Sequence, residues 1–290
     1  MRMIQYNLWN TCKNNCTFCF NKDRKKDVNK IDNIKHILEL LDLEEVKNYD
    51  TIAIIGGEIF DFKMDEELRK VFYELINKIV NTNKNIYVMT NLIYDRKLEL
   101  DEFIKYLAEK KVLEKLQICT SYDLKGRFKT EESLRLFNNN FNYLKKKNIK
   151  LHIEMILTDI LIKSILDNSF DLKSFKLLYT DNIDFIAPHC GCYGKTTKDF
   201  TDDNEFFTTR ETFLKFLQKE FLELKDINPE RFLKRESHSN ICYYLVNDKL
   251  VRYGDRIRQV GSMPQDHNVN YKDDDKHSMH EDFITFKELL

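Results

Sequence analysis

The sequence predicts an α/β fold in which helices cover a parallel sheet. Short apolar runs of strand length alternate with segments whose apolar residues recur every three or four positions, the spacing of an amphipathic helix. The 290 residues include only three prolines and seven glycines, and no linker rich in serine, glycine or proline divides the alternating units. Such alternation indicates right-handed crossovers and a ligand site at the carboxyl ends of the strands.

Six strand–helix units follow one another along the chain. The expected strands are residues 3–9, 51–55, 85–90, 116–120, 150–157 and 184–187. The expected helices cover the apolar repeats at 31–41, 64–79, 103–107 and 134–144, followed by a broken helical stretch over 160–178. Thr130 is the expected N-cap of the fourth helix. We therefore predict one domain over residues 1–190.

Residues 191–290 are expected to form a small extension. A capping box at 208–211 predicts a helix through Phe221. Residues 241–246 and 249–253 predict a β-hairpin that turns at Asn247-Asp248. A polar segment over 261–282, either a loop or partly disordered, and a short helical tail over 283–290 complete the expected extension.

Composition excludes several classes of protein. With 47 basic and 48 acidic residues the net charge is −1, which gives no general attraction to nucleic acid. No apolar run is long enough to cross a bilayer, and the amino terminus lacks a secretory signal. Seven cysteines, three of them clustered, suit a reducing compartment in which thiolates hold metal. We expect a cytoplasmic, globular protein.

The clustered cysteines are Cys12, Cys16 and Cys19, in a short loop after the first strand. Their spacing lets one loop present three thiolates to one iron–sulfur cube. Because such cubes normally have four cysteine ligands, a trio leaves one iron open to a ligand other than protein. The alternative is a zinc knuckle, but zinc sites usually add a second Cys/His pair at a distance, and His36 falls in a helical pattern.

The run Cys12-Lys-Asn-Asn-Cys16-Thr-Phe-Cys19 resembles the CxxxCxΦC motif of the radical S-adenosylmethionine (radical SAM) superfamily. The second strand also runs into Gly56-Gly57-Glu58, the next landmark of that family. The resemblance implies an open partial barrel of six parallel strands. It also implies an oxygen-sensitive [4Fe-4S] cluster on the three cysteines, with S-adenosylmethionine bound to the free iron through its amino and carboxylate groups.

The same resemblance implies the chemistry. An electron from a small donor of the flavodoxin or ferredoxin type enters through the cluster. Reductive cleavage of S-adenosylmethionine then gives methionine and a 5′-deoxyadenosyl radical, which abstracts a hydrogen atom from a substrate. The cofactor supplies the reactivity, while the protein orients the reactants and excludes water and oxygen.

Further cofactor contacts are expected at strand ends. Glycines at 56 and 57 permit close backbone approach where relatives bind the methionine amino group. Thr90 and Asn91 resemble a Thr-Asn-Gly motif, although Leu92 replaces the glycine. The complete set of expected cofactor contacts is Phe18, Gly56, Gly57, Glu58, Thr90, Asn91, Ser121 and Asp123. The alternative for the polar members is that they simply end strands and begin turns.

Candidate catalytic residues are Glu154 and His189. A charged residue in a buried strand needs a partner, so we expect Glu154 to face the barrel lumen. His189, at the end of the sixth strand, could exchange a proton with substrate or be structural. The arginine that many relatives place after the fifth strand is absent.

The remaining cysteines allow a second cluster. Cys190, Cys192 and Cys242 faintly resemble the auxiliary-cluster ligands of some relatives, but Tyr253 stands where a further cysteine would be expected. They are either ligands of a second iron–sulfur cluster or ordinary loop cysteines. Cys119, within a strand, is expected to be a core residue.

The leading hypothesis is a radical SAM enzyme that acts on a small molecule, a nucleotide or a short peptide, with peptide or protein modification favoured. Because the cysteine trio lies so early, we expect no leader-peptide or cobalamin domain before it. The alternative is a non-catalytic iron–sulfur or zinc-binding sensor or interaction module on the same barrel. The Gly56-Gly57-Glu58 run argues against that alternative, since a metal holder has no use for a cofactor-amine site.

Overall fold

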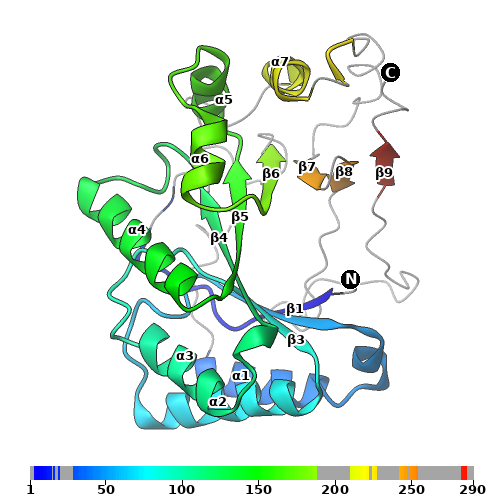
Figure 1. Cartoon of the computed structure of the whole chain (residues 1–290). Helices are drawn as coiled ribbons and strands as arrows, with labels where there is room; N and C mark the ends of the chain where they lie inside the picture. Colours follow the sequence, from blue (N-terminus) through cyan, green and yellow to red (C-terminus); the bar gives the residue numbers. More distant parts are fainter. Residues whose placement is uncertain are drawn as a thin grey trace.

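Six parallel strands form one sheet in the computed structural model of the chain (Figure 1). The structure describes residues 3–14, 16, 19, 29–187, 210–221, 224–226, 242–246, 249–253 and 282–285. The strands are β1 (Met3–Asn7), β2 (Thr51–Ile55), β3 (Asn85–Met89), β4 (Leu116–Tyr122), β5 (Lys150–Ile156) and β6 (Ile183–Ala187). They pair in sequence order, each parallel to the next. The predicted fold class, a partial barrel of six parallel strands, is confirmed.

Helices connect the strands and flank the sheet (Figure 1). They are α1 (Lys30–Leu40), α2 (Glu66–Asn81), α3 (Leu100–Glu109), α4 (Glu131–Lys146), α5 (Asp159–Leu166) and α6 (Leu172–Leu178). Thr130 caps α4 as predicted: its hydroxyl accepts from the Ser133 amide while Ser133 accepts from the Thr130 amide. The broken stretch over 160–178 is two helices, and Asn168, at a φ of 64°, follows the first of them.

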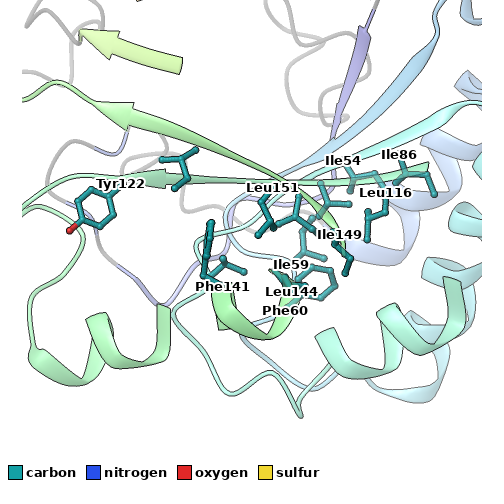
Figure 2. Packing of buried hydrophobic residues seen from close by; sticks show 14 of the residues in the cluster. Ile54, Ile59, Phe60, Ile86, Leu116, Tyr122, Phe141, Leu144, Ile149 and Leu151 are labelled. Atoms are coloured by element: carbon teal, nitrogen blue, oxygen red, sulfur yellow. The ribbon is translucent and has the colours of Figure 1, made fainter. Parts of the chain in front are cut away.

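Alternate strand residues give the sheet two different faces. One face packs against the helices in a large apolar core, part of which Figure 2 shows: Ile54, Ile86, Leu116 and Leu151 lie close to Ile59, Phe60, Phe141 and Leu144. Burying each such side chain contributes roughly 1.5–3 kcal/mol relative to its exposure. The other face carries a separate small cluster of Ala53, Ile55, Tyr87 and Cys119, and we call this face the lumen. Cys119 is therefore buried there, as the sequence predicted.

The extension begins with α7 (Arg210–Glu220), which packs beside α5 (Figure 1). Residues 208 and 209 of its expected capping box lie outside the described residues. The predicted hairpin is confirmed as β7 (Cys242–Val246) and β8 (Lys249–Tyr253), and β7 pairs antiparallel with β6. The hairpin thus continues the barrel sheet. The domain boundary near residue 190 stays a prediction.

Two local expectations need correction. The first residues of the tail expected to be helical over 283–290 instead form a strand, β9 (Asp282–Thr285), which pairs antiparallel with β8. Residues 286–290 lie outside the described residues. A short apolar run is compatible with both a helix and a strand. Here the strand is formed because its backbone pairs with the N–H and C=O groups on the edge of β8. The sequence patterns also missed a 3₁₀ helix at Glu44–Asn48. No helix among the described residues is both long and apolar enough to span a bilayer.

Candidate active site

The cysteine loop (residues 8–19) leaves β1 alongside the loop that follows β2. The Gly57 amide donates to the Trp9 carbonyl at 2.7 Å. The next amide, that of Glu58, donates to the Thr11 carbonyl at 2.9 Å. The start of the cysteine loop is therefore bonded, backbone to backbone, to the Gly-Gly-Glu run.

Only glycine fits at this junction, because a Cβ atom would lie too close to the backbone of the cysteine loop. A Cβ atom at Gly57 would lie 2.2 Å from the Thr11 carbonyl oxygen and 2.4 Å from that of Asn10. At Gly56 the nearest atom would be the Trp9 carbonyl oxygen, at 2.8 Å. The sequence predicted close backbone approach at these glycines. The approaching backbone in the structure is the chain's own cysteine loop.

Three side chains strengthen the junction. The indole Nε1 of buried Trp9 donates to the Glu58 carbonyl at 2.7 Å. Buried Asp61 accepts from the Lys13 amide at 2.8 Å, and the Lys13 ammonium donates to the Asp61 carbonyl at 2.6 Å. The backbone on both sides of Cys12 is thereby held in place.

The Glu58 carboxylate is fully buried and joins the end of β2 to the end of β3. Its Oε1 accepts from the amides of Ile59 and Phe60 and, at 2.7 Å, from the Thr90 hydroxyl. Its Oε2 accepts from the Asn91 amide at 2.6 Å. Burial raises the pKa of Glu58 to about 7, although these hydrogen bonds oppose the shift.

Asn91 lies against the first cysteine. Its side-chain Nδ2 donates to the Cys12 Sγ at 3.6 Å, and that sulfur also contacts the Asn14 carbonyl at 3.4 Å. Burial raises the pKa of Cys12 to about 12, and the nearby Glu58 adds to the shift. Leu92, the residue in place of the family's glycine, has a φ of 58°. The backbone conformation that favours glycine is therefore kept.

The other two cysteines lie toward the end of β5. Cys16 is buried against Ile156, and Cys19 packs beside them. Burial raises the pKa of Cys16, while the buried guanidinium of Arg127 acts in the opposite direction. Cys12 and Cys19 also interact electrostatically with Arg127. The positive charge of Arg127 therefore interacts with all three thiols.

Asp123 shapes the loop that carries this arginine. Its Oδ2 accepts from the Gly126 amide at 2.5 Å and from the Arg127 amide at 3.1 Å, while Oδ1 lies 3.9 Å from the Arg127 Nε. Burial raises the pKa of Asp123, and Arg127 opposes that shift. Ser121, two residues earlier, is also buried. Asp123 thus forms a turn, which is the alternative to a cofactor contact that the sequence left open for it.

The donor set of the cysteine loop suits an iron–sulfur cube. The loop offers the three thiols of Cys12, Cys16 and Cys19, and its sequence contains no histidine, aspartate or glutamate that would complete a site for a single ion. In a [4Fe-4S] cube each cysteine binds a different iron, so three thiolates leave one iron for another ligand. The donor set therefore fits the cluster.

Three polar side chains contact one another in a row on the lumen face, beside the site. The Tyr87 hydroxyl lies 2.9 Å from the His152 Nδ1, and the His152 Nε2 lies 2.9 Å from an Asp184 carboxylate oxygen. Glu154 is half-buried and pairs in register with Asp184 across β5 and β6. Burial raises the pKa of Glu154 to about 7, His152 opposes the shift, and Asp184 adds to it. The lumen position expected for Glu154 agrees with this geometry.

Several predicted residues lie outside this description. Phe18, His189, Cys190 and Cys192 are outside the described residues, and for Cys242 only the place in β7 is known. The sequence patterns also missed Trp9, Asp61 and Arg127. Each is buried in a loop and acts on residues far away in the chain, so no local spacing marks it.

Comparison with known proteins identifies the family. The family model described as the radical SAM superfamily matches residues 6–162, more than half of the chain. The chain belongs to the radical SAM superfamily. A comparison with curated proteins finds no match.

The chain is also similar to solved structures. The structure of native anSMEcpe with bound AdoMet and Kp18Cys peptide matches at 16% identity and a TM-score of 0.50, over 82% of this chain and 62% of that one. Native anSMEcpe with bound AdoMet matches at 15% identity and a TM-score of 0.48, over 82% and 63% of the two chains. The radical SAM chain described here thus spans less than two thirds of that protein's length.

Proposed function

We propose that the chain is a radical SAM enzyme that removes a hydrogen atom from a substrate held in the lumen. Cys12, Cys16 and Cys19 would hold a [4Fe-4S] cluster, and S-adenosylmethionine would bind beside it. The observation that carries the proposal is the junction of the cysteine loop with Gly57 and Glu58. It fixes Cys12, the first of the three thiols, next to the Gly-Gly-Glu run that resembles the second landmark of the family.

The chain's own residues would position the reactants. When bound and reduced by a small flavodoxin- or ferredoxin-type donor, the cluster and S-adenosylmethionine supply a 5′-deoxyadenosyl radical. Glu58 holds the ends of β2 and β3 together, and the buried Ser121 and the turn at Asp123 border the same edge of the sheet. Phe18 is proposed to lie at the adenine.

We propose Glu154 as the group that handles a proton of the substrate. It lies on the lumen side beside Asp184 and His152, and a pKa of about 7 lets its carboxyl group gain or lose a proton near neutral pH. Tyr87 and Asp184 hold the imidazole of His152 from both sides. His189 stays a second candidate.

A short peptide is the proposed substrate. The fold is similar to that of a protein whose structure contains a bound peptide, Kp18Cys. The β7–β8 hairpin also widens the sheet beyond the six barrel strands, next to the lumen residues of β6. A nucleotide or other small molecule is the next class to test.

Anaerobic reconstitution with iron and sulfide tests the proposed function. The brown protein, reduced in the presence of S-adenosylmethionine, should release 5′-deoxyadenosine even without substrate. Cys16→Ala should abolish the release and leave the fold largely intact by circular dichroism. Cys119→Ala, a buried cysteine outside the cysteine loop, should take up as much iron as the wild type. Release that persists in Cys16→Ala would refute the ligand assignment, and a colourless zinc protein would refute the enzyme.

A further inference from the structure

The side chain of Asn91 is committed to the cysteine loop. Its Oδ1 accepts from the Ile93 amide at 2.6 Å, so the other end of the carboxamide, Nδ2, must point away from that turn. Nδ2 points at the Cys12 Sγ, 3.6 Å away. The orientation of this amide therefore follows from its hydrogen bonds.

The backbone of Asn91 is equally fixed. Its amide donates to the Glu58 Oε2 at 2.6 Å, and that carboxylate is itself held by Thr90 and by its own loop. Leu92 continues the turn at a positive φ of 58°. Asn91 is 6% exposed, so water competes little for its amide. A rigid, buried N–H group thus faces a proposed ligand sulfur.

We propose that Asn91 is a positioning residue that hydrogen-bonds the Cys12 thiolate and raises the reduction potential of the cluster bound there. This inference rests on the proposed function. Adding one electron from an external reductant makes the ligand sulfurs more negative and breaks no bond. An N–H···S hydrogen bond therefore stabilises the reduced state more than the oxidised state. Both ends of the carboxamide are in use, which argues against the side-chain contact with S-adenosylmethionine expected from the sequence.

Asn140 offers a matched control. It is also a buried asparagine, and its Nδ2 supports the same turn by donating to the carbonyls of Leu92 at 3.0 Å and Tyr94 at 2.8 Å. It donates to two carbonyls of the turn, whereas Asn91 donates to the Cys12 sulfur. Substituting each asparagine by serine thus separates disturbance of the turn from loss of the N–H···S bond.

The experiment is a reductive titration of the reconstituted protein, followed by electron paramagnetic resonance. Asn91→Ser keeps an oxygen that can accept from Ile93 but removes the donor to Cys12. We expect its cluster to have a more negative midpoint potential than the wild type and Asn140→Ser to match the wild type. Asn91→Asp keeps the shape of the side chain and its Oδ1, and it should also shift the midpoint potential downward. This variant takes the place of Asn91→Ser if the serine variant does not fold.

Three results would overturn the inference. The first is a folded, iron-loaded Asn91 variant with the wild-type potential. The second is an equal shift in Asn140→Ser, which would assign the effect to the turn. The third is a folded Asn91 variant that takes up no iron, which would make Asn91 a structural requirement. Wild-type protein that forms no cluster would instead refute the proposed function, so the two failures are distinguishable.

Discussion

At the scale of single residues, the missing side chain of Gly57 decides whether the cysteine loop can reach the sheet. Two hydrogen bonds, from the Gly57 and Glu58 amides, require the backbones to approach closely. Any Cβ at Gly57 would overlap carbonyl oxygens, which are backbone atoms and cannot rotate away. The gap between the backbones, and with it the place of Cys12, is set by this glycine.

We predict that Gly57→Ala costs more stability than Gly56→Ala. The new methyl group would lie 2.2 Å from a carbonyl oxygen at position 57 but 2.8 Å from one at position 56. Overpacking of this kind costs on the order of 1–3 kcal/mol or more. Urea unfolding measures the free energy, and iron content after reconstitution reports on the loop. Equal stability and iron uptake in both variants would show that the loop does not need this close approach.

Glu154 gives a pH prediction at the same scale. Burial disfavours its charge and raises its pKa from an ordinary value of 4.5 to about 7 in the folded protein. Between these values the folded state binds a proton that the unfolded state lacks, so the contribution of Glu154 to stability falls as pH rises. The groups that face it are Tyr87 on β3, Cys119 on β4, His152 on β5, Asp184 on β6 and the Arg127 guanidinium.

Glu154→Gln removes this ionisation and should flatten the dependence. Relative to the wild type, the variant should gain on the order of 3 kcal/mol in unfolding free energy between pH 4.5 and pH 7, since each pKa unit corresponds to about 1.4 kcal/mol. Urea unfolding of the apo-protein at several pH values measures the difference. Parallel curves for the two proteins would contradict the raised pKa.

At the scale of elements, α1 supports the point at which β1 becomes the cysteine loop. Asn33 is fully buried in α1, and its Nδ2 donates to the carbonyls of Asn7 at 2.9 Å and Leu8 at 2.6 Å. Asn7 is the last residue of β1 and Leu8 is the first residue beyond it, so these carbonyls lie where the strand ends. The helix thereby sets the direction in which the loop leaves the sheet.

We predict that Asn33→Ala lowers both stability and iron uptake. Removing the donor leaves buried carbonyls without a partner, at a cost of about 1–3 kcal/mol. Asn29→Ala is the control on the same helix: Asn29 is the exposed N-cap, accepts from Ile31 and Asp32, and should cost about 1 kcal/mol without loss of iron. A parallel loss of iron in both variants would attribute the effect to α1 as a whole.

At the scale of the whole molecule, one sheet runs from β1, which carries the cysteine loop, through β6 to the β7–β8 hairpin and β9 (Figure 1). The two regions proposed to bind iron and substrate are therefore connected by a continuous ladder of hydrogen bonds. Cys242, in β7, pairs in register with Tyr253, so a tyrosine occupies the position opposite this cysteine. The pair therefore contains one possible cluster ligand, whereas two cysteines at these positions would have provided two.

We expect a single cluster, and therefore about four iron atoms per chain after reconstitution. The triple variant Cys190→Ser, Cys192→Ser, Cys242→Ser should keep this iron content, because the cysteine loop alone binds the cube. Elemental analysis with sulfide determination measures both proteins. About eight iron atoms in the wild type, falling to about four in the variant, would establish a second cluster instead.

Comparison of sequence and structure shows which features were predictable. The strands and α-helices over 3–187 follow from apolar periodicity, since each period fixes which residues face the core. The tail at 282–285 did not, because its strand depends on pairing with β8. At the site, the spacing of the cysteines and Gly56-Gly57-Glu58 was visible. Asp61 and Arg127 were not, because their partners are distant in sequence or depend on a loop conformation.

The sequence by itself determined the fold class, the family and the three thiols, because these depend on local spacing along the chain. Only the tertiary structure decided what Gly57, Glu58 and Asn91 do. Their roles arise from contacts across strands: the Glu58 carboxylate accepts from an amide 33 residues away, and the Asn91 Nδ2 donates to a sulfur 79 residues away. Close approach and burial are properties of packing, and no pattern of neighbours in the chain encodes them directly.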